Sequence, residues 1–266
     1  MSHAELLDLA RSVATKAAEL AARRRIEGVA VADRKTSSVD VVTHADRESE
    51  QLIRSLLADA RPADGFFGEE SGAAEGSSGL TWVIDPIDGT VNYLYGIPHY
   101  AVSVAVVEGE PDPSTWRALA GAVVNLGANE TYTGMIGGGS FLNGHPLRVA
   151  ESVDLSEALV ATGFSYLREL RVEQGRVIAE LLPHVRDIRR MGTASLDLCM
   201  VASGRVNAYF ERSLNPWDHA AGALIAREAG ATVKGRGDNA EGKDFILAAE
   251  PAVALLLDAA LARLDA

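Results

Sequence analysis

The segment 82–93, with the sequence WVIDPIDGTVNY, constrains the fold of this chain more than any other stretch. Its first residues, Trp82 to Ile84, are apolar and β-prone, which predicts a short buried strand. Asp85 and Asp88 follow directly, and Gly89-Thr90 then begins a turn. We therefore expect a strand that delivers two carboxylates to its own end. Such oxygen ligands suit a hard cation such as Mg²⁺.

Two further acidic elements flank this segment in the sequence. The pair Glu69-Glu70 lies upstream, and Trp217-Asp218 lies far downstream, ahead of an apolar helical run. Three acidic elements without a cysteine or histidine cluster favour a Mg²⁺ site over a zinc site. One such residue alone would be better explained as a turn former or a helix cap. The combination favours a metal site.

Composition narrows the functional class. The chain has 266 residues, 47% of them hydrophobic, and a formal net charge of −12, so nothing suggests disorder or general nucleic-acid binding. No apolar run reaches the roughly 20 residues of a membrane helix, and the N-terminus lacks the features of a signal peptide. Cys199 is the only cysteine, which fits a reducing cytoplasm and predicts a buried, inert thiol.

Periodicity and turn signals predict an α+β first half. Ser2 and Glu5 form a capping box at the start of the first helix, and Asn143-Gly144 is a strong hairpin signal within 141–149. The predicted helices span 2–27 and 43–60, the strands 66–67, 82–84, 100–107, 119–125 and 130–133, and the polar or surface loops 33–40 and 71–79.

The second half alternates strands and helices, which is typical of α/β layering. There is no repeat and no long linker, so we expect one compact unit. Its expected halves are 1–150, which carries most metal ligands, and 151–266, which carries Asp218 and the substrate contacts. The predicted strands are 159–161, 187–191, 206–210 and 245–249, and the predicted helices are 167–182, 195–202, 220–229 and 251–264.

Three motifs carry a family resemblance. Gly68-Glu69-Glu70-Ser71, Asp85-Pro86-Ile87-Asp88-Gly89-Thr90 and Trp217-Asp218-x-Ala220-Ala221-Gly222 resemble, in order and spacing, the signatures of the inositol monophosphatase family. The similarity runs from about residue 35 to residue 230. It implies a layered α-β-α-β-α sandwich of the inositol monophosphatase and fructose-1,6-bisphosphatase type. It also implies Mg²⁺-dependent hydrolysis of a small phosphate monoester, inhibition by lithium and a homodimer.

The resemblance also assigns metal ligands. It implies that Glu69, Asp85 and the Ile87 carbonyl hold one cation, while Asp218 shares Asp85 and Asp88 around a second. Two cations at such a site clamp a phosphoryl group and lower the pKa of a bound water.

Four residues receive catalytic roles by the same resemblance. The Thr90 hydroxyl would orient the attacking water with Asp46 as its partner, and Glu70 would assist. Lys35 would belong to a loop that closes over the site. On the residues alone, Asp46 is better explained as a cap formed with Thr43, and Lys35 as a solvated loop residue.

The implied substrate contacts come from both halves. Asp88, Gly89 and Thr90 would hold the phosphate end, partly through backbone N–H groups at a helix start. Gly192, Thr193, Ala194 and Glu211 would contact the substrate ring, with Ala194 offering its N–H and Glu211 accepting from hydroxyls. Without the family, Glu211 could be only an edge-strand charge.

The expected substrate is myo-inositol 1-phosphate, and three other phosphate esters remain open. L-histidinol phosphate carries an ammonium group that would suit Glu211. Fructose 1,6-bisphosphate and adenosine 3′,5′-bisphosphate would need a second basic pocket. A different class, an RNA-associated or transcription-associated interaction protein, also stays open, although the charge of −12 weighs against nucleic acid as a partner.

Overall fold

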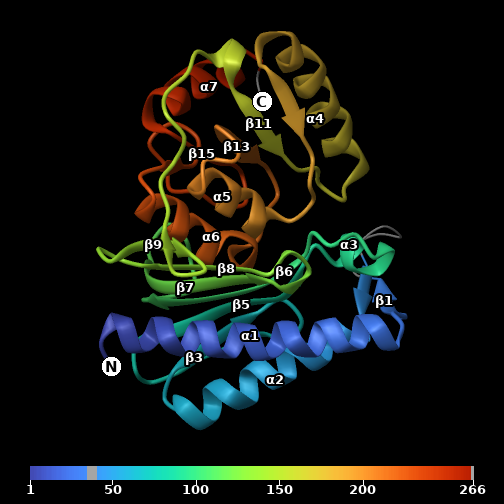
Figure 1. The fold of residues 1–266 in the computed structure, drawn as a ribbon, viewed down its shortest axis with the longest axis vertical. Coiled ribbons are helices and arrows are strands. Elements are labelled where there is room, and N and C mark those ends of the chain that lie inside the picture. Colours follow the sequence, from blue (N-terminus) through green and yellow to red (C-terminus); the bar gives the residue numbers. More distant parts are fainter. Residues whose placement is uncertain (35–40, 265–266) are drawn as a thin grey trace.

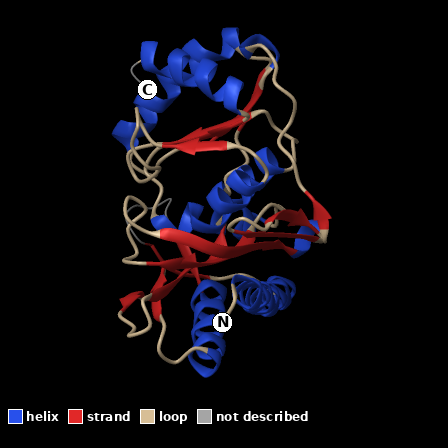
Figure 2. Cartoon of the chain, turned by 90° about the vertical axis from the view of Figure 1, so that its left-hand side faces the viewer, coloured by secondary structure: helices blue, strands red, loops and turns tan. Residues whose placement is uncertain are grey.

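The chain folds into five alternating layers. The computed structural model describes residues 1–34 and 41–264. Figure 1 shows helices α1 and α2 beneath a first sheet, α5 and α6 between the two sheets, and α4 and α7 beyond the second sheet. Figure 2, turned by 90°, shows the same succession of helices and strands. The predicted α-β-α-β-α sandwich is therefore confirmed.

The first sheet has eight strands and is antiparallel except where β3 pairs with β5. All of its strands come from the first 146 residues. In spatial order they are β10 (His145–Pro146), β9 (Gly139–Leu142), β8 (Glu130–Met135), β7 (Arg117–Asn125), β6 (Ala101–Glu108), β5 (Leu80–Asp88), β3 (Gly65–Gly68) and β4 (Gly72–Ala74).

The second sheet has five strands, all from residue 159 onward. Three of them run parallel and the other two are antiparallel to their neighbours. In spatial order they are β12 (Asp187–Arg189), β11 (Leu159–Thr162), β13 (Ala208–Glu211), β15 (Ile246–Ala249) and β14 (Thr232–Lys234). The first sheet is thus built from residues before 150 and the second from residues after it. A domain boundary at residue 150 stays a prediction.

The helices cover both faces of each sheet. A two-stranded ribbon of β1 (Val31–Arg34) and β2 (Val41–Thr43) leads into α2, and short 3₁₀ turns cover Leu126–Ala128, Leu155–Glu157 and Leu182–His184. The helices are α1 (His3–Glu27), α2 (His44–Ala60), α3 (Thr90–Tyr95), α4 (Arg168–Leu181), α5 (Ala194–Ala202), α6 (Pro216–Glu228) and α7 (Pro251–Arg263). No helix among the described residues combines the length and apolarity needed to cross a membrane.

Small residues let the central helices lie close to the first sheet and to each other. A Cβ at Gly121 of β7 would lie 3.0 Å from the Ala221 side chain of α6, and a Cβ at Gly222 would lie 2.9 Å from Leu198 of α5. Interiors are packed too densely to absorb such overlaps without rearrangement. The close packing fixes α6, and with it Asp218, against the sheet that carries β5.

Most predicted elements are confirmed, and three predictions were wrong in part. Helix α6 begins at Pro216 and not at residue 220, because proline suits the first helical position and Asn215 caps it. Residues 33–34 belong to strand β1, since they pair with β2, although a loop was expected there. Residues 72–74, also expected in a loop, form the edge strand β4 beside β3.

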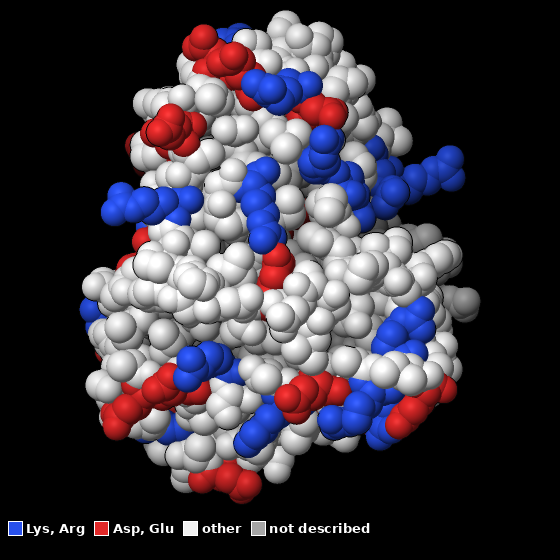
Figure 3. Space-filling model, viewed as in Figure 1, with Lys and Arg blue, Asp and Glu red and all other residues white. Residues whose placement is uncertain are grey.

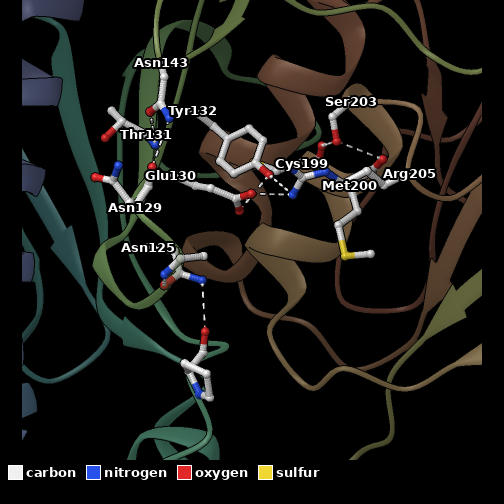
Figure 4. Close-up of polar contacts among 12 residues, drawn as sticks. Asn125, Asn129, Glu130, Thr131, Tyr132, Asn143, Cys199, Met200, Ser203 and Arg205 are labelled. Carbon is white, nitrogen blue, oxygen red and sulfur yellow. Dashed lines mark hydrogen bonds and ion pairs between the residues drawn. The ribbon is translucent and has the colours of Figure 1, made fainter.

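Polar contacts tie the first sheet to the helices above it (Figure 4). Arg205, just after α5, donates from Nη1 to the Tyr132 hydroxyl of β8 at 3.0 Å and pairs with Glu130 at 2.5 Å. Tyr132 in turn donates to Glu130 at 3.0 Å. At the predicted hairpin, Asn143 adopts a φ of 49° and Gly144 a φ of 80°, the conformation that an Asn-Gly turn favours. Cys199 is buried in the same core cluster as Tyr132, and burial raises the pKa of its thiol well above the ordinary value.

Candidate functional site

The end of strand β5 is irregular at the point where its carboxylates occur. Pairing with β6 is regular up to Asp85 and resumes only at Asp88, so the register shifts between them. Pro86 has no N–H to donate to the ladder, which favours such a break. A bulge re-aims the side chains around it. The Ile87 N–H, freed from the ladder, donates to Asp85 Oδ1 at 3.0 Å.

One cleft of about 440 Å³ brings the predicted site residues from the two halves together. Strand β5 and its turn form one side, and the second half supplies the other. The predicted residues that line it are Glu69, Asp85, Ile87, Asp88, Gly89, Thr90, Gly192, Thr193, Ala194, Glu211 and Asp218. Residues more than a hundred positions apart in the sequence thus share one solvent-filled space.

The carboxylates of the cleft raise each other's affinity for protons. Burial, together with the negative charge of Glu69, raises the pKa of Asp88 above its ordinary value. Burial and the charges of Glu69 and Asp88 raise the pKa of Asp218 well above its ordinary value. Burial and the charge of Asp88 raise the pKa of Glu211 from 4.5 to about 7, despite a hydrogen bond from Tyr209. Such a concentration of buried negative charge is unfavourable unless protons or cations compensate it.

The chemistry of these side chains fits an oxygen-preferring divalent cation. Within residues 1–34 and 41–264, no group of three or more acidic, histidine or cysteine side chains is placed closely enough to hold a metal ion by itself. Zinc sites of the structural type need four such protein ligands. Mg²⁺, in contrast, keeps several waters and binds through one or two carboxylates plus substrate phosphate. An open cleft lined by carboxylates and the Ile87 carbonyl therefore fits Mg²⁺ better than zinc.

Thr90 and Asp46 are in direct contact, although Asp46 comes from helix α2. The Thr90 hydroxyl lies 3.0 Å from Asp46 Oδ1 and 3.0 Å from the Ile87 carbonyl oxygen. Asp46 Oδ2 accepts the Thr43 backbone N–H at 2.8 Å, so the residue also caps its helix. The capping interpretation and the pairing with Thr90 both describe this side chain. Burial raises the pKa of Asp46 from 3.8 to about 7, with Glu69 and Glu70 adding to the rise.

Asp218 likewise caps a helix while facing the cleft. It is the third residue of α6, and the Asn215 N–H donates to its Oδ2 at 2.6 Å. Because the helix starts earlier than its apolar pattern suggests, Asp218 lies inside the first turn and not ahead of it. The helix dipole favours a negative charge at this position.

The turn 192–194 joins the two halves of the molecule. The Thr193 hydroxyl donates to the His99 carbonyl at 2.8 Å, and the Ser195 N–H donates to Asp88 Oδ2 at 2.7 Å. The backbone N–H of Ala194 also lies near Asp88 and acts to lower the pKa of its carboxyl. Gly192 has a φ of 85°, which favours glycine.

Glu211 ends strand β13 and is held by its neighbour. The Tyr209 hydroxyl donates to Glu211 Oε2 at 2.6 Å. The carboxylate occupies the space into which a side chain at Gly163 would project. A substituent at residue 163 would therefore displace Glu211. The glutamate is fixed at the cleft from two sides, which an edge-strand surface charge would not be.

Two predicted catalytic residues need separate mention. Glu70 is not among the described residues that line the cleft, although it follows Glu69 directly. Its backbone N–H donates to Glu50 Oε2 at 2.8 Å. Lys35 lies outside the described residues, so its role stays a prediction.

The cleft also contains residues that the sequence did not single out. Arg190 lines it together with Arg212 and Lys243. Asp197 of α5 does not line the cleft; it is 1% exposed, and neither of its carboxylate oxygens has a hydrogen-bond partner among the described residues. Burial and the charges of Glu211 and Asp88 raise its pKa well above the ordinary value. In the sequence Asp197 is hidden within an otherwise apolar helix, so no local pattern marks it.

Comparison with known proteins agrees with this geometry. The family model described as "Inositol monophosphatase family" matches residues 2–264. An inositol-1-monophosphatase SuhB of Mycobacterium tuberculosis is 42% identical over 98% of this chain and 95% of its own length. A protein of Vibrio cholerae named Nus factor SuhB is 37% identical over 91% of this chain and 88% of its own length.

Solved structures show the same likeness. The extragenic suppressor protein SuhB of Bartonella henselae superposes with a TM-score of 0.87 at 33% identity, covering 97% of this chain and 98% of that one. The M. tuberculosis SuhB structure gives a TM-score of 0.83 at 42% identity, covering 99% and 98%. Because the family model matches nearly the whole length of this chain, the chain belongs to the inositol monophosphatase family and is a phosphoric monoester hydrolase.

Proposed function

We propose that this phosphatase hydrolyses myo-inositol 1-phosphate to inositol and phosphate with Mg²⁺ as its cofactor. The observation that carries the proposal is the shared cleft. Its first-half wall offers carboxylates and a carbonyl for cations, and its second-half wall offers Glu211 for a polyol. A neutral ring with several hydroxyls can donate to a carboxylate held in this way. The M. tuberculosis relative is named for the same activity.

Glu69, Asp85, the Ile87 carbonyl, Asp88 and Asp218 are the proposed cation ligands. Bound cations would supply charge neutralisation of the phosphate and a lowered pKa for a bound water. Thr90 would orient that water. Asp46 and the Ile87 carbonyl both lie within reach of the Thr90 hydroxyl hydrogen. Its oxygen lone pairs then remain available to accept a hydrogen bond from water.

The remaining predicted residues would place the ester. Asp88, Gly89 and Thr90 stand at the start of α3, whose first N–H groups have no partner within the helix. Gly89 has a φ of 89°, and its lack of a side chain leaves room for the Thr193 hydroxyl beside this turn. Gly192, Thr193 and Ala194 line the same cleft and would hold the ring side through the backbone. Glu70 and Lys35 are kept as proposed catalytic residues on the family resemblance.

Removal of the cation gives a prediction about stability. Asp88, one of the proposed cation ligands, has a folded-state pKa of about 7, raised from 3.8 by burial and by the charge of Glu69. It therefore contributes stability that is full below the unfolded pKa and is lost as the pH rises through about 7. We expect the cation-free protein to lose this contribution between about pH 4 and pH 7. Because a cation binds the ionised carboxylates, its stabilising effect should grow over the same interval.

Thermal unfolding measures this directly. Tm is recorded in EDTA and in excess Mg²⁺ at constant ionic strength, in steps between about pH 5 and pH 8. The difference in Tm should widen as the pH rises. A difference that stays constant or narrows would contradict a cation site built from these carboxylates.

Substitution of Glu211 by Gln tests how the ring is recognised. Gln keeps the shape of the side chain but replaces a charged acceptor with a neutral amide. Charged hydrogen bonds are roughly twice as strong as neutral ones. For myo-inositol 1-phosphate, kcat/KM should therefore fall by a factor that corresponds to about 1–3 kcal/mol of lost transition-state stabilisation. Phenyl phosphate, which has no ring hydroxyls, should lose much less. L-histidinol phosphate, if it is the natural substrate, should lose most, since its ammonium group would lose a counter-charge.

Kinetics on the three esters, with wild type and variant side by side, separate these substrates. Tyr209→Phe serves as the matched control, because it removes the bond that holds Glu211 but keeps the carboxylate. It should reduce discrimination less than Glu211→Gln. Equal losses on all three esters would mean that Glu211 supports the site without contacting the substrate.

The cleft also contains Arg190, Arg212 and Lys243. These cations could accept a second phosphate, so fructose 1,6-bisphosphate and adenosine 3′,5′-bisphosphate belong in the substrate panel. A second basic pocket is what these two substrates would need. Ranking kcat/KM over the whole panel with Mg²⁺ tests the proposed substrate, and a preference for a bisphosphate would replace it.

A role in transcription is the second candidate, favoured by the V. cholerae relative that is named a Nus factor. The net charge of −12 weighs against direct binding of nucleic acid. On the face in Figure 3, Lys and Arg alternate with Asp and Glu over the lower half, while several Lys and Arg side chains gather on the right of the upper half. Retention on RNA that weakens steeply with salt would support this role. The homodimer and the cytoplasmic location stay predictions.

A further inference from the structure

Helix α2 carries three polar residues one turn apart, which we call the α2 polar row: Asp46, Glu50 and Arg54. The spacing of four residues places them on one face of the helix. Asp46 contacts Thr90, as described above. The other two contact the turn that joins β3 to β4, which contains Glu69. One helix face therefore touches two separate parts of the cleft wall.

Glu50 is a buried carboxylate with a defined task. It is 2% exposed, and its Oε2 accepts the Glu70 backbone N–H at 2.8 Å. A Cβ at Gly68 would lie 2.5 Å from the same oxygen, so the approach requires a glycine there. Burying a carboxylate is costly unless hydrogen bonds compensate it. A charge-assisted bond to a backbone N–H supplies such compensation.

The turn after β3 is held on both sides. The Glu69 N–H donates to the Ile84 carbonyl of β5 at 3.3 Å, while Glu50 holds the next N–H along the chain. Arg54 donates to the Ser71 hydroxyl, and its guanidinium lies 4.2 Å from the centre of the Phe66 ring. Three consecutive residues of the turn are thus tied to β5 or to the α2 polar row. Glu69, the first of them, lines the cleft.

We propose that Glu50 is a positioning residue for the acidic cleft, because its carboxylate oxygen fixes the Glu70 backbone and thereby the position from which Glu69 faces the cleft. Glu50 itself is not among the described cleft-lining residues. Its action on a cation would therefore pass through the turn. The inference rests on the proposed function only where Glu69 is taken as a cation ligand.

Two conservative substitutions distinguish geometry from charge. Glu50→Gln keeps the reach of the side chain and a carbonyl acceptor but removes the charge. Glu50→Asp keeps the charge but withdraws the acceptor by one methylene. Positioning through the hydrogen bond predicts that Glu50→Asp weakens Mn²⁺ binding by about tenfold or more, whereas Glu50→Gln stays within about threefold of wild type. Mn²⁺, which shares the preference for oxygen ligands, is titrated into the whole chain and followed by electron paramagnetic resonance.

Amide hydrogen exchange supplies a readout that needs neither metal nor activity. In the metal-free protein, the Glu70 amide should exchange at least about tenfold faster in Glu50→Asp and at nearly the wild-type rate in Glu50→Gln. Glu48→Asp and Glu48→Gln are the matched controls. Glu48 lies on the same helix, 42% exposed, and pairs with Arg24. Neither control should change Mn²⁺ binding or Glu70 exchange.

Two results would overturn the proposal. Unchanged Mn²⁺ affinity and Glu70 exchange in Glu50→Asp would show that the hydrogen bond positions nothing. Alternatively, Glu50→Gln and Glu50→Asp could lose equal Mn²⁺ affinity and equal Glu70 protection while both retain the wild-type Tm. The carbonyl acceptor would then not be sufficient, and the negative charge of Glu50 would be needed as well as its length. A wild-type chain that binds no Mn²⁺ and releases no phosphate would refute the proposed cation site instead. Glu70 exchange would still decide whether Glu50 positions the turn.

Discussion

Replacing Asp85 by Asn is expected to reduce kcat for phosphate release roughly a thousandfold, corresponding to about 4 kcal/mol of lost transition-state stabilisation. Asp85 is the carboxylate proposed to be shared by both cations. It is 2% exposed and stands at the bulge that ends β5. The amide removes one negative charge from the cation site while it keeps the shape of the side chain.

The fold should survive this substitution. In Asp85→Asn the amide oxygen would still accept the Ile87 N–H, which lies 3.0 Å from Oδ1 of the native Asp85. Removing one charge from a crowded acidic cluster also relieves repulsion. In EDTA we therefore expect a Tm at or slightly above that of the wild type, within about 4 °C. The opposite effects on activity and on stability distinguish a ligand from a structural residue.

Phosphate release at saturating Mg²⁺ and thermal unfolding in EDTA are the two measurements. Asp59→Asn is the matched control, since it makes the same chemical change at an exposed position of α2. It should leave both values unchanged. Near-normal kcat in Asp85→Asn would eliminate the shared-carboxylate assignment. A large drop in Tm in EDTA would instead make Asp85 a structural residue.

The sequence predicted the parts of the site that depend on local patterns. Strand β5 is recognisable because three apolar residues precede Asp85. The carboxylates Asp85 and Asp88 belong to the same segment, so their place at the strand end is predicted together with the strand. Helix α1 begins at a capping box that the structure contains. The five-layered arrangement, in contrast, followed from the family resemblance, with which the order of predicted elements agreed. For strand β5 and the start of helix α1, the sequence pattern and the structural element that it predicts lie in the same short segment.

The rest depends on contacts between distant segments. In the sequence, Glu50 has no feature that distinguishes it from other helix residues. Its hydrogen bond with the Glu70 N–H forms only because the folded chain brings the turn after β3 next to α2. No local pattern in the sequence marks Arg190, which lines the cleft beside the turn 192–194. Helix α6 was placed too late because Asp218 and His219 follow Trp217, so the continuous apolar run starts only at Ala220. The contacts of these residues involve segments far away in the sequence, so no local sequence pattern predicts them.

Replacing Thr90 by Val is the other substitution with a large expected effect. Val matches the shape of Thr but removes the hydroxyl that lies 3.0 Å from both Asp46 Oδ1 and the Ile87 carbonyl oxygen. A positioned group that orients and deprotonates a nucleophile contributes about 10²–10⁴-fold. We therefore expect kcat to fall about a hundredfold or more, with little change in Mg²⁺ dependence.

Thr90→Ser is the matched control, because Ser keeps the hydroxyl and loses only a methyl group. It should retain most of the wild-type kcat. Asp46→Asn should resemble Thr90→Val, and the double variant should lose little more than either single one, since the two side chains would act as one unit. If the losses instead added fully, Asp46 and Thr90 would act separately. In that case the contact between them would reflect only the role of Asp46 as the cap of α2.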